Sequence, residues 1–583
     1  MIQLRIDQFF DSFTSFQLFR EPYFRATLYR IPTATQIKAL LAAMLAFAVK
    51  ERSANNNDHA SSRNDGVSRD EGSELSSHFS LLAMKYVDHA VSECQDDPLS
   101  LPLLQALILI THWLLIQGVR GRAWRYLGLC IRSAYELNLH LIDLGRGLED
   151  NLSDPAQWCE DEERRRAWWA IWEMDVFASV IRRCPTAIDW SQNESFLPAE
   201  DDKWFRGEPQ QSCILETSLV SRWKALEASG NQSPKAWFIV INSLMKEAQK
   251  ISSPIGIDRA LSLKPQLTAR NTNSNHEGRR RPDAGPTKDA INRLYTVHNS
   301  LRCAVMALPR GLKYESQFLG FGAGDMIRDG TSSRRLQYSS VYSIHLMTQL
   351  TKLMIYKYYI FRTGLIWPHL AADPGRLRGQ LDENNYLQKP SSGVLPTVTE
   401  TQALEQYFDA ADETAGIIRR CFENHYKYVN PFLSNIIWLA AAVQLLHREL
   451  YPASSSDKDL INSNFELLCM TYNQFVNYWN MSTTLQKNLH TLETEFQALQ
   501  NDADEQQHGE RYADETLNAL HRDGAWNPPI SRTDQARADS SRQDAARARS
   551  EKSPPHPHPP PPASEWTVGP YQEERQTTNM AIS

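Results

Sequence analysis

The stretch EDEERRRAWWAIWEMDVFASVIRRCP, residues 160–185, carries the clearest helix signals of the chain. Acidic residues open it, Arg182 and Arg183 close it, and Pro185 stops it, in the order that the helix macrodipole and the geometry of proline favour. Between these ends, apolar residues recur at three- and four-residue spacing: Trp168, Ile171, Met174, Phe177, Ala178 and Ile181. The stretch therefore predicts a long helix over 161–183 with one buried face.

The same periodicity extends in both directions along the chain. Residues 121–140, GRAWRYLGLCIRSAYELNLH, place their apolar side chains on one helical face, and the run 101–118 reads as a buried core helix. Alternating strand patterns are nearly absent. We therefore predict an all-α, multi-helix fold, with further helices near residues 214–227, 236–250, 289–308, 337–363, 402–425, 432–450 and 459–500.

Polar stretches interrupt and end this helical part. Residues 51–76 and 264–288 are rich in Asn, Ser, Arg and Gly and predict long loop inserts. From residue 501 the chain turns polar and ends near the proline run SPPHPHPPPPASE. Such a composition does not form a core, so we expect one helical domain over 1–500 and a disordered tail over 501–583.

Composition bounds the class of protein. The chain has 583 residues, of which 42% are hydrophobic, including 15 Trp, which is enough to bury a large core. Its formal net charge is −7, so any affinity for nucleic acid would have to come from a local patch or from a partner. The N-terminus lacks the apolar stretch of a signal peptide. We expect an intracellular protein without a membrane span.

Motifs for catalysis or metal binding are missing. The eight cysteines include no C-x₂-C pair, and the phosphate-loop, H-E-x-x-H and G-x-S-x-G patterns are absent. Gly320, Gly322 and Gly324 in LGFGAGD come nearest to a phosphate loop, but no strand precedes them. We therefore expect no enzyme activity, no catalytic residue, no bound cofactor and no metal in this chain.

Two motifs resemble a known family. GRAWRYLGLCIRSAYELNLHL at 121–141 and EDEERRRAWWAIWEMDVFASVIRRCPTAID at 160–189 resemble the signatures of the fungal-specific transcription factor domain. This domain is the middle homology region of fungal binuclear zinc-cluster transcription factors. Shorter stretches at 8–13, 20–24 and 430–443 are also similar to it, so the resemblance covers roughly residues 1–500.

The sequence departs from the family pattern at several positions. Cys130 stands where Ala is usual, Asn138 replaces a Gly, and Arg183 stands where the family has the Gly of a Gly-Arg-Pro turn. Family members usually carry a zinc cluster before this domain, whereas this chain begins almost at the first motif of the domain. Two hypotheses follow: an upstream cluster is missing from this chain, with zinc expected only then, or the protein acts through a DNA-bound relative.

Polar residues on the buried faces suggest a structural role. Asp175 shares a helical face with Trp168 and Ile171, so it projects toward the core and needs a partner or a proton. Arg132 on the preceding helix is the predicted partner, and His140 at the end of that helix is predicted to be a satisfied structural histidine. Ligand sensing is the alternative role for Asp175.

Two further clusters have alternative interpretations. Trp168, Trp169 and Trp172 either pack in the core or line an effector pocket, since regulators of this kind are thought to sense metabolites. The run Arg279, Arg280 and Arg281 is either a nuclear-import signal or a solvated loop.

The resemblance implies a nuclear transcriptional regulator of a metabolic or secondary-metabolite gene set. The protein would reach DNA indirectly or through an N-terminal module. It would form a homodimer, or a heterodimer with a related regulator. Coregulators would contact its C-terminal tail. The alternative hypothesis is a metabolite-binding or scaffolding all-α protein without a role at DNA. The target genes, the sign of regulation, the effector and the oligomeric state do not follow from the sequence.

Overall fold

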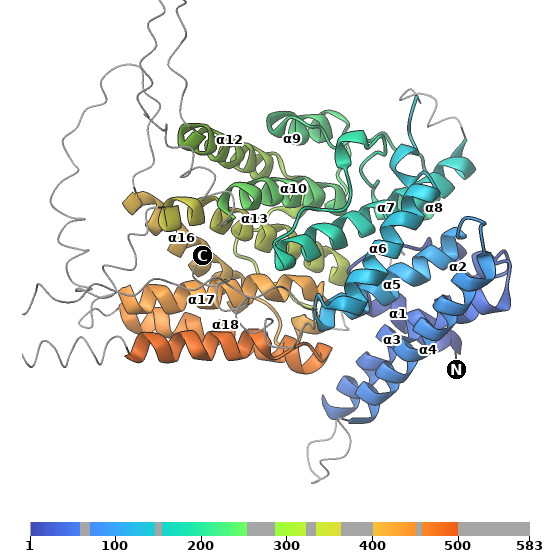
Figure 1. Ribbon diagram of the computed structural model, residues 1–583, viewed down its shortest axis with the longest axis horizontal. Coiled ribbons are helices and arrows are strands. Elements are labelled where there is room, and N and C mark those ends of the chain that lie inside the picture. The colour runs from blue at the N-terminus through green and yellow to red at the C-terminus, as the bar shows by residue number, and fades with distance from the viewer. Residues whose placement is uncertain are drawn as a thin grey trace, which may run out of the picture. The chain divides into compact units, whose positions relative to one another are not determined.

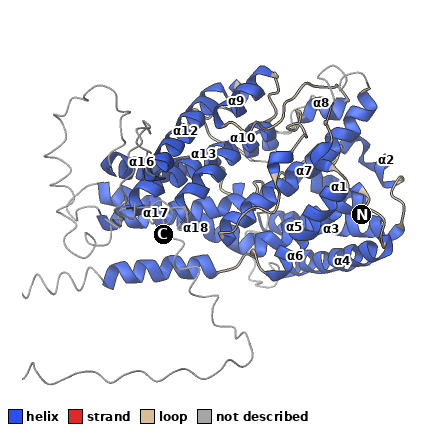
Figure 2. Ribbon diagram, turned by 45° about the horizontal axis from the view of Figure 1, so that its top comes forward, coloured by secondary structure: helices blue, strands red, loops and turns tan. Residues whose placement is uncertain are grey.

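The computed structural model describes residues 2–58, 70–145, 154–253, 286–321, 334–362, 400–450 and 457–498. Regular structure in these ranges is helical, and the one isolated bridge among them joins Leu319 and Cys421 (Figure 2). The all-α prediction is confirmed. Residues 1–493 belong to one compact unit, and residues 494–579 are grouped in a second, of which the structure describes 494–498.

The first part of the compact unit is a cluster of helices around α5 (Leu101–Gln117) (Figure 1). Nearly every side chain of α5 is buried, which confirms that this apolar run is a core helix. Among the described helices, none combines the length and the apolarity that crossing a bilayer requires. The helices packed around α5 are α3 (Ala34–Asp58), α4 (Asp70–Cys94), α6 (Gly121–Glu136) and α7 (Pro155–Arg182), with α1 (Ile2–Ser12) against α3.

The second part continues the same packing with later helices. Helix α10 (Pro234–Ser252) packs against both α7 and α13 (Arg334–Arg362), and α13 in turn packs against α16 (Glu400–Arg419). The remaining long helices are α9 (Leu219–Ala228), α12 (Pro286–Ala307), α17 (Ser434–Leu450) and α18 (Asp457–Trp479). Short helices are α2 (Phe24–Leu28), α8 (Asp201–Arg206) and the 3-10 segments Glu21–Tyr23, Leu139–Leu141, Trp190–Gln192, Arg310–Leu312, His425–Lys427 and Pro431–Leu433.

The predicted insert at 51–76 is too long. Helix α3 continues to Asp58 and α4 begins at Asp70, because the two helices pack along one another and extend beyond their apolar parts. Residues 59–69 between them lie outside the described residues. The same holds for most of the predicted loop at 264–288, since α12 begins at Pro286, and for the predicted tail at 501–583.

The last predicted helix, 459–500, is two helices. Helix α18 ends at Trp479, and helical structure resumes at residue 484. Asn480 between them has a φ of 55°, in the left-handed region that asparagine tolerates better than most residues. The N–H of Met481 donates to the carbonyl oxygen of Val476 at 3.0 Å, which closes the end of α18 as in a Schellman cap.

Helix α7 begins six residues earlier than predicted. Pro155 is its first residue, and the Asp154 carboxylate accepts from the backbone N–H groups of Ala156 and Gln157 at 2.9 and 3.2 Å. The acidic residues that were predicted to open the helix, Asp161 and Glu162, therefore lie in its second turn and are buried. The Asp-Pro signal at 154–155 identifies the true start.

Replacing Asp154 with Ala should lower the free energy of unfolding by about 1 kcal/mol, because two N-terminal N–H groups of α7 lose their acceptor. Asp154→Asn, which keeps an acceptor oxygen at the cap, should behave like the wild type. Chemical denaturation of the two variants measures this difference. Equal losses in both variants would mean that the charge of Asp154 matters and its capping bonds do not.

Candidate functional site

The first half of α7 carries a buried ionic network. The Arg165 guanidinium, only 2% exposed, donates through Nε to Asp143 at 2.8 Å and lies 3.4 Å from Glu162. Arg166 donates to Glu162 at 2.8 Å and also pairs with Asp201. Burial acts to lower the pKa of both guanidiniums, but these carboxylates outweigh it and raise the pKa above the ordinary value. Both arginines are therefore held charged inside the protein.

The network also binds the backbone of the segment that follows α7. The N–H of Phe196 donates to Asp143 at 2.8 Å, and the N–H of Ala199 donates to Glu162 at 2.9 Å. In return, Arg166 donates to the carbonyl oxygen of Ala199 at 2.7 Å. The acidic-then-arginine run of the second motif thus attaches the segment 196–201 to α7. Its role is structural.

Asp143→Ala should cost about 3–5 kcal/mol of unfolding free energy, because Arg165 would remain buried without its main partner. Lys250→Ala, which breaks an exposed 3.1 Å pair with Glu247, should cost less than about 1 kcal/mol. Urea denaturation of both variants tests the contrast. Similar small losses would show that the buried network does not hold the domain together.

The predicted pair of Asp175 with Arg132 is wrong. Arg132 is exposed on α6, whereas Asp175 is buried and accepts from the backbone N–H of Ile188 at 2.9 Å. Burial raises the pKa of Asp175, and the backbone N–H groups of Ala187 and Ile188 oppose this shift. Helical spacing placed Asp175 on the correct face, but the partner of its Oδ2 is the backbone N–H of Ile188 and not a cation of α6. Its Oδ1 has no hydrogen-bond partner among the described residues.

His140 lies at the end of the α6 region, half-buried against aromatic rings. Its ring lies 4.8 Å from that of Tyr135 and 6.1 Å from that of Trp168, measured between centroids. Burial lowers its pKa. Its backbone carbonyl oxygen accepts from the N–H of Glu194 at 2.7 Å. His140 therefore joins this corner through its ring and its backbone, and it is not part of a pair with Asp175 or Arg132.

The three tryptophans of α7 are all buried, but they do not form one pocket floor. Trp168 donates to the Asn193 side chain at 2.8 Å, and Trp169 donates to the carbonyl oxygen of Phe196 at 2.7 Å. Trp172 packs edge-on against Trp169, with 5.5 Å between ring centroids. Of the three, Trp169 alone lines one of the pockets described below, and the other two are core residues.

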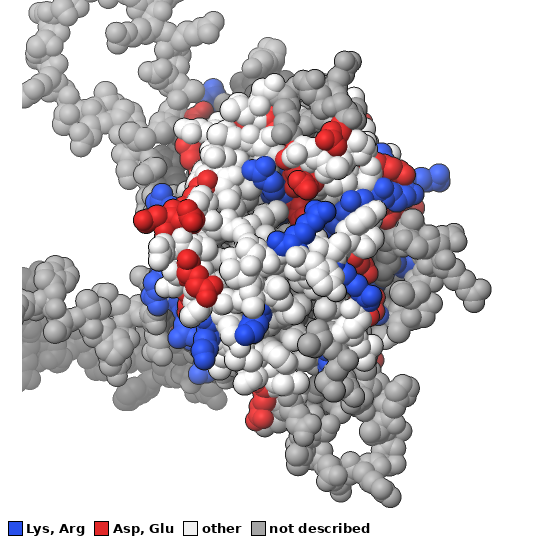
Figure 3. All heavy atoms as spheres, turned by 90° about the vertical axis from the view of Figure 1, so that its right-hand side faces the viewer, with Lys and Arg blue, Asp and Glu red and all other residues white. Residues whose placement is uncertain are grey.

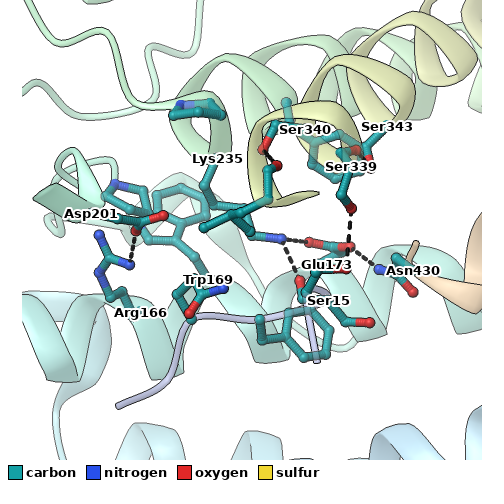
Figure 4. A pocket seen from close by; sticks show the side chains of 17 residues that line it. Ser15, Arg166, Trp169, Glu173, Asp201, Lys235, Ser339, Ser340, Ser343 and Asn430 are labelled. Atoms are coloured by element: carbon teal, nitrogen blue, oxygen red, sulfur yellow. Dashed lines mark hydrogen bonds and ion pairs between the residues drawn. The ribbon is translucent and has the colours of Figure 1, made fainter. Parts of the chain in front are cut away.

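A small polar pocket lies between α7, α10, α13 and the N-terminal segment (Figure 4). At its centre, the Lys235 ammonium lies 2.7 Å from the buried carboxylate of Glu173 and donates to the carbonyl oxygen of Ser15 at 3.1 Å. Asn430 donates to the other Glu173 oxygen at 2.9 Å. Burial raises the pKa of Glu173, and Lys235 and Asn430 oppose that shift. The charges of this cluster are therefore balanced internally.

The walls of the polar pocket also include the ion pair of Arg166 with Asp201 and three serines of α13, Ser339, Ser340 and Ser343 (Figure 4). The pocket has a volume of about 60 Å³, room for on the order of four water molecules. Its lining contains neither histidine nor cysteine, and its two carboxylates, Glu173 and Asp201, are paired with Lys235 and Arg166. This pocket suits water or a small polar group.

A larger apolar cavity, of about 140 Å³, lies on the other side of Glu173 and Phe238. Helices α7, α10, α13 and α17 supply most of its walls. Apolar side chains predominate, among them Phe177, Met245, Met347, Leu350, Met354 and Ile436. Its polar and charged lining side chains include Arg183, Asn242 and Lys357, and the others are Glu173, Gln249, Ser252, Ser253 and Asn435. The sequence motifs predicted none of Arg183, Asn242 and Lys357 as site residues, because they come from three different helices.

The sequence patterns also did not single out two further buried titratable groups, Lys50 and His112. Burial lowers the pKa of Lys50 to about 7, and its ammonium lies 5.1–5.4 Å from the ring centroids of Trp113, Tyr478 and Trp479. Burial lowers the pKa of His112 to about 3, and four phenylalanine rings surround it: Phe13, Phe16, Phe47 and Phe432. Both groups are structural parts of the core.

Charge and metal-binding groups are dispersed in the described part of the chain. No cluster of three or more His, Cys, Asp or Glu side chains there could hold a metal ion. On the face drawn in Figure 3, basic and acidic side chains are interspersed, and neither kind gathers into a broad patch. Arg279, Arg280 and Arg281 lie outside the described residues.

Comparison with known proteins gives the same family that the two sequence motifs resemble. Residues 6–279 match the family model of the fungal specific transcription factor domain. These residues form a fungal specific transcription factor domain. Within this transcription factor domain, the acidic and arginine residues of the second motif form the buried ionic network that binds the segment 196–201.

Two curated relatives are similar to part of the chain. Tropolone cluster transcription factor tropK of Talaromyces stipitatus is 28% identical over 151 residues, which are 26% of this chain and 26% of that protein. Transcription factor tazR of Aspergillus terreus is 28% identical over 118 residues, 20% of this chain and 18% of that protein. The chain thus matches about a quarter or less of the length of either relative.

The transcription factor domain, as the family model delimits it, ends before the compact unit does. Helices α2 to α10 and most of α1 fall within the matched residues, whereas α13 and α17 follow them. Both cavities are lined by residues from the two parts. The later helices are therefore an integral part of the packing around α7.

Proposed function

We propose that this protein is a transcriptional regulator of a secondary-metabolite gene set in a fungus. The observation that carries the proposal is the fungal specific transcription factor domain at residues 6–279. Two relatives that match part of the chain are named transcription factors, and one of them is named for a tropolone cluster. These names also favour a regulatory over an enzymatic role. The regulator is proposed to act in the nucleus.

The route to DNA is part of the proposal. The net charge of −7 favours recognition of DNA through a separate module over direct binding by the helical part, and the face drawn in Figure 3 shows no broad basic patch. That module is either a zinc cluster or a DNA-bound relative with which the chain forms a dimer. Coregulators are proposed to contact the polar segment 501–583, whose composition suits coupled folding and binding.

A tethering experiment tests regulatory activity directly. The full chain, fused to a heterologous DNA-binding domain, should change expression of a reporter several-fold compared with the DNA-binding domain alone. A fusion of residues 1–500 should lose part of this effect if the segment 501–583 recruits coregulators. If the full fusion leaves the reporter unchanged, and deletion of the gene leaves transcript levels unchanged, the metabolite-binding or scaffolding alternative replaces the proposal.

Nuclear import supplies a second test. Changing Arg279, Arg280 and Arg281 together to Ala should lower the nuclear-to-cytoplasmic ratio of a fluorescent fusion, because a contiguous basic run is the recognised feature. Changing Arg542, Arg547 and Arg549 to Ala removes the same number of charges from another polar segment and should have no effect. Equal ratios in both triple variants would remove this signal from the proposal.

A further inference from the structure

The apolar cavity between α7, α10, α13 and α17 has the size of a ligand site. Its volume of about 140 Å³ is close to the ~150 Å³ of an engineered protein cavity that takes up benzene. Helix α10 packs against α7 and α13, and α13 packs against α17, so the four helices that line the cavity belong to one packed group (Figure 1). A ligand of single-ring size would bury its apolar surface here.

Two cations line this apolar space without a counter-charge. Arg183 at the end of α7 and Lys357 on α13 both belong to the lining, and neither forms an ion pair within the described part of the chain. Burial, together with Arg183, lowers the pKa of Lys357 to about 8. The one carboxylate in the lining, Glu173, is already neutralised by Lys235 and Asn430. The cavity therefore carries excess positive charge, which an anion would balance.

Arg183 occupies a backbone position that disfavours it. Its φ of 54° and ψ of 39° lie in the left-handed region, where the N–H of Cys184 donates to the carbonyl oxygen of Ser179 at 3.1 Å and closes α7. Glycine is the preferred residue at such a helix end, and a residue with a Cβ is strained there. The arginine therefore occupies a strained backbone position, and its side chain belongs to the cavity lining.

A buried polar atom also faces this space without a partner. Asn242 on α10 is 2% exposed and lines the cavity, and its Oδ1 accepts no hydrogen bond from any described residue. An unsatisfied buried acceptor is destabilising unless a ligand or a water supplies the donor. A hydroxyl group on a bound molecule would satisfy it.

We propose that this cavity binds a small apolar acid of single-ring size, with its anionic group between Arg183 and Lys357 and its ring among the apolar side chains of α7, α10 and α13. A ring hydroxyl would supply the donor that Asn242 lacks. The site is a property of the folded chain, so its test on purified protein does not depend on the transcriptional role proposed above.

Calorimetric titration of the full purified chain with benzoate tests the proposal, with benzamide as the uncharged ligand of equal shape. Benzoate should bind at least tenfold more tightly than benzamide. Arg183→Gly should weaken benzoate binding tenfold or more while the melting temperature stays the same or rises, because glycine relieves the strained position. Lys357→Met, which keeps the apolar volume of the side chain, should weaken benzoate but not benzamide.

Arg182→Gln is the matched control, since Arg182 neighbours Arg183 in sequence but is exposed and does not line the cavity. It should leave benzoate binding unchanged. The proposal is overturned if the wild type binds no benzoate at millimolar concentrations, if benzoate and benzamide bind equally, or if Arg182→Gln loses as much affinity as Arg183→Gly. A lower melting temperature for Arg183→Gly with unchanged benzoate affinity would show that Arg183 is structural.

Discussion

The ion pairs of Arg165 and Arg166 with Asp143, Glu162 and Asp201 are the constraint on which the rest of the structure depends. Two guanidiniums buried in one turn of α7 require carboxylates, and those carboxylates come from α7 itself and from the chain on either side of it. Because Glu162 and Asp143 also accept backbone N–H groups, the segment 196–201 has to follow α7 closely. This determines where the chain enters α8 and α10.

The position of α10 in turn creates the two cavities. Lys235, near the start of α10, reaches Glu173 on α7, while Asn242, two turns later, lines the apolar cavity on the other side of Phe238. The polar pocket is charge-balanced and small, whereas the apolar cavity is larger and lined by two cations without carboxylate partners in the described residues. Helices α7 and α10 therefore contribute to both the charge-balanced polar pocket and the apolar cavity, and the apolar cavity suits a ligand.

Helix positions were largely predictable because local periodicity determines them. The buried run at 101–117 and the apolar face of α7 were both predicted, and the true start of α7 was readable from Asp154-Pro155. The site was not predictable to the same extent. Spacing placed Asp175 on a buried face, but its partner proved to be the backbone of Ile188, and Arg132 proved to be exposed. Periodicity identifies which face of a helix is buried, but it does not identify the hydrogen-bond partner of a polar residue on that face.

The sequence by itself determined the all-α class, the order of the main helices and the resemblance to the fungal transcription factor domain, since each depends on residues close together in the chain. Only the tertiary structure decided that Glu173 meets Lys235 and Asn430, and that Arg183, Asn242 and Lys357 line one cavity. Glu173 and Asn430 are 257 positions apart. Contacts at such separation arise from helix packing, in which many side chains together select one arrangement, and no local pattern records them.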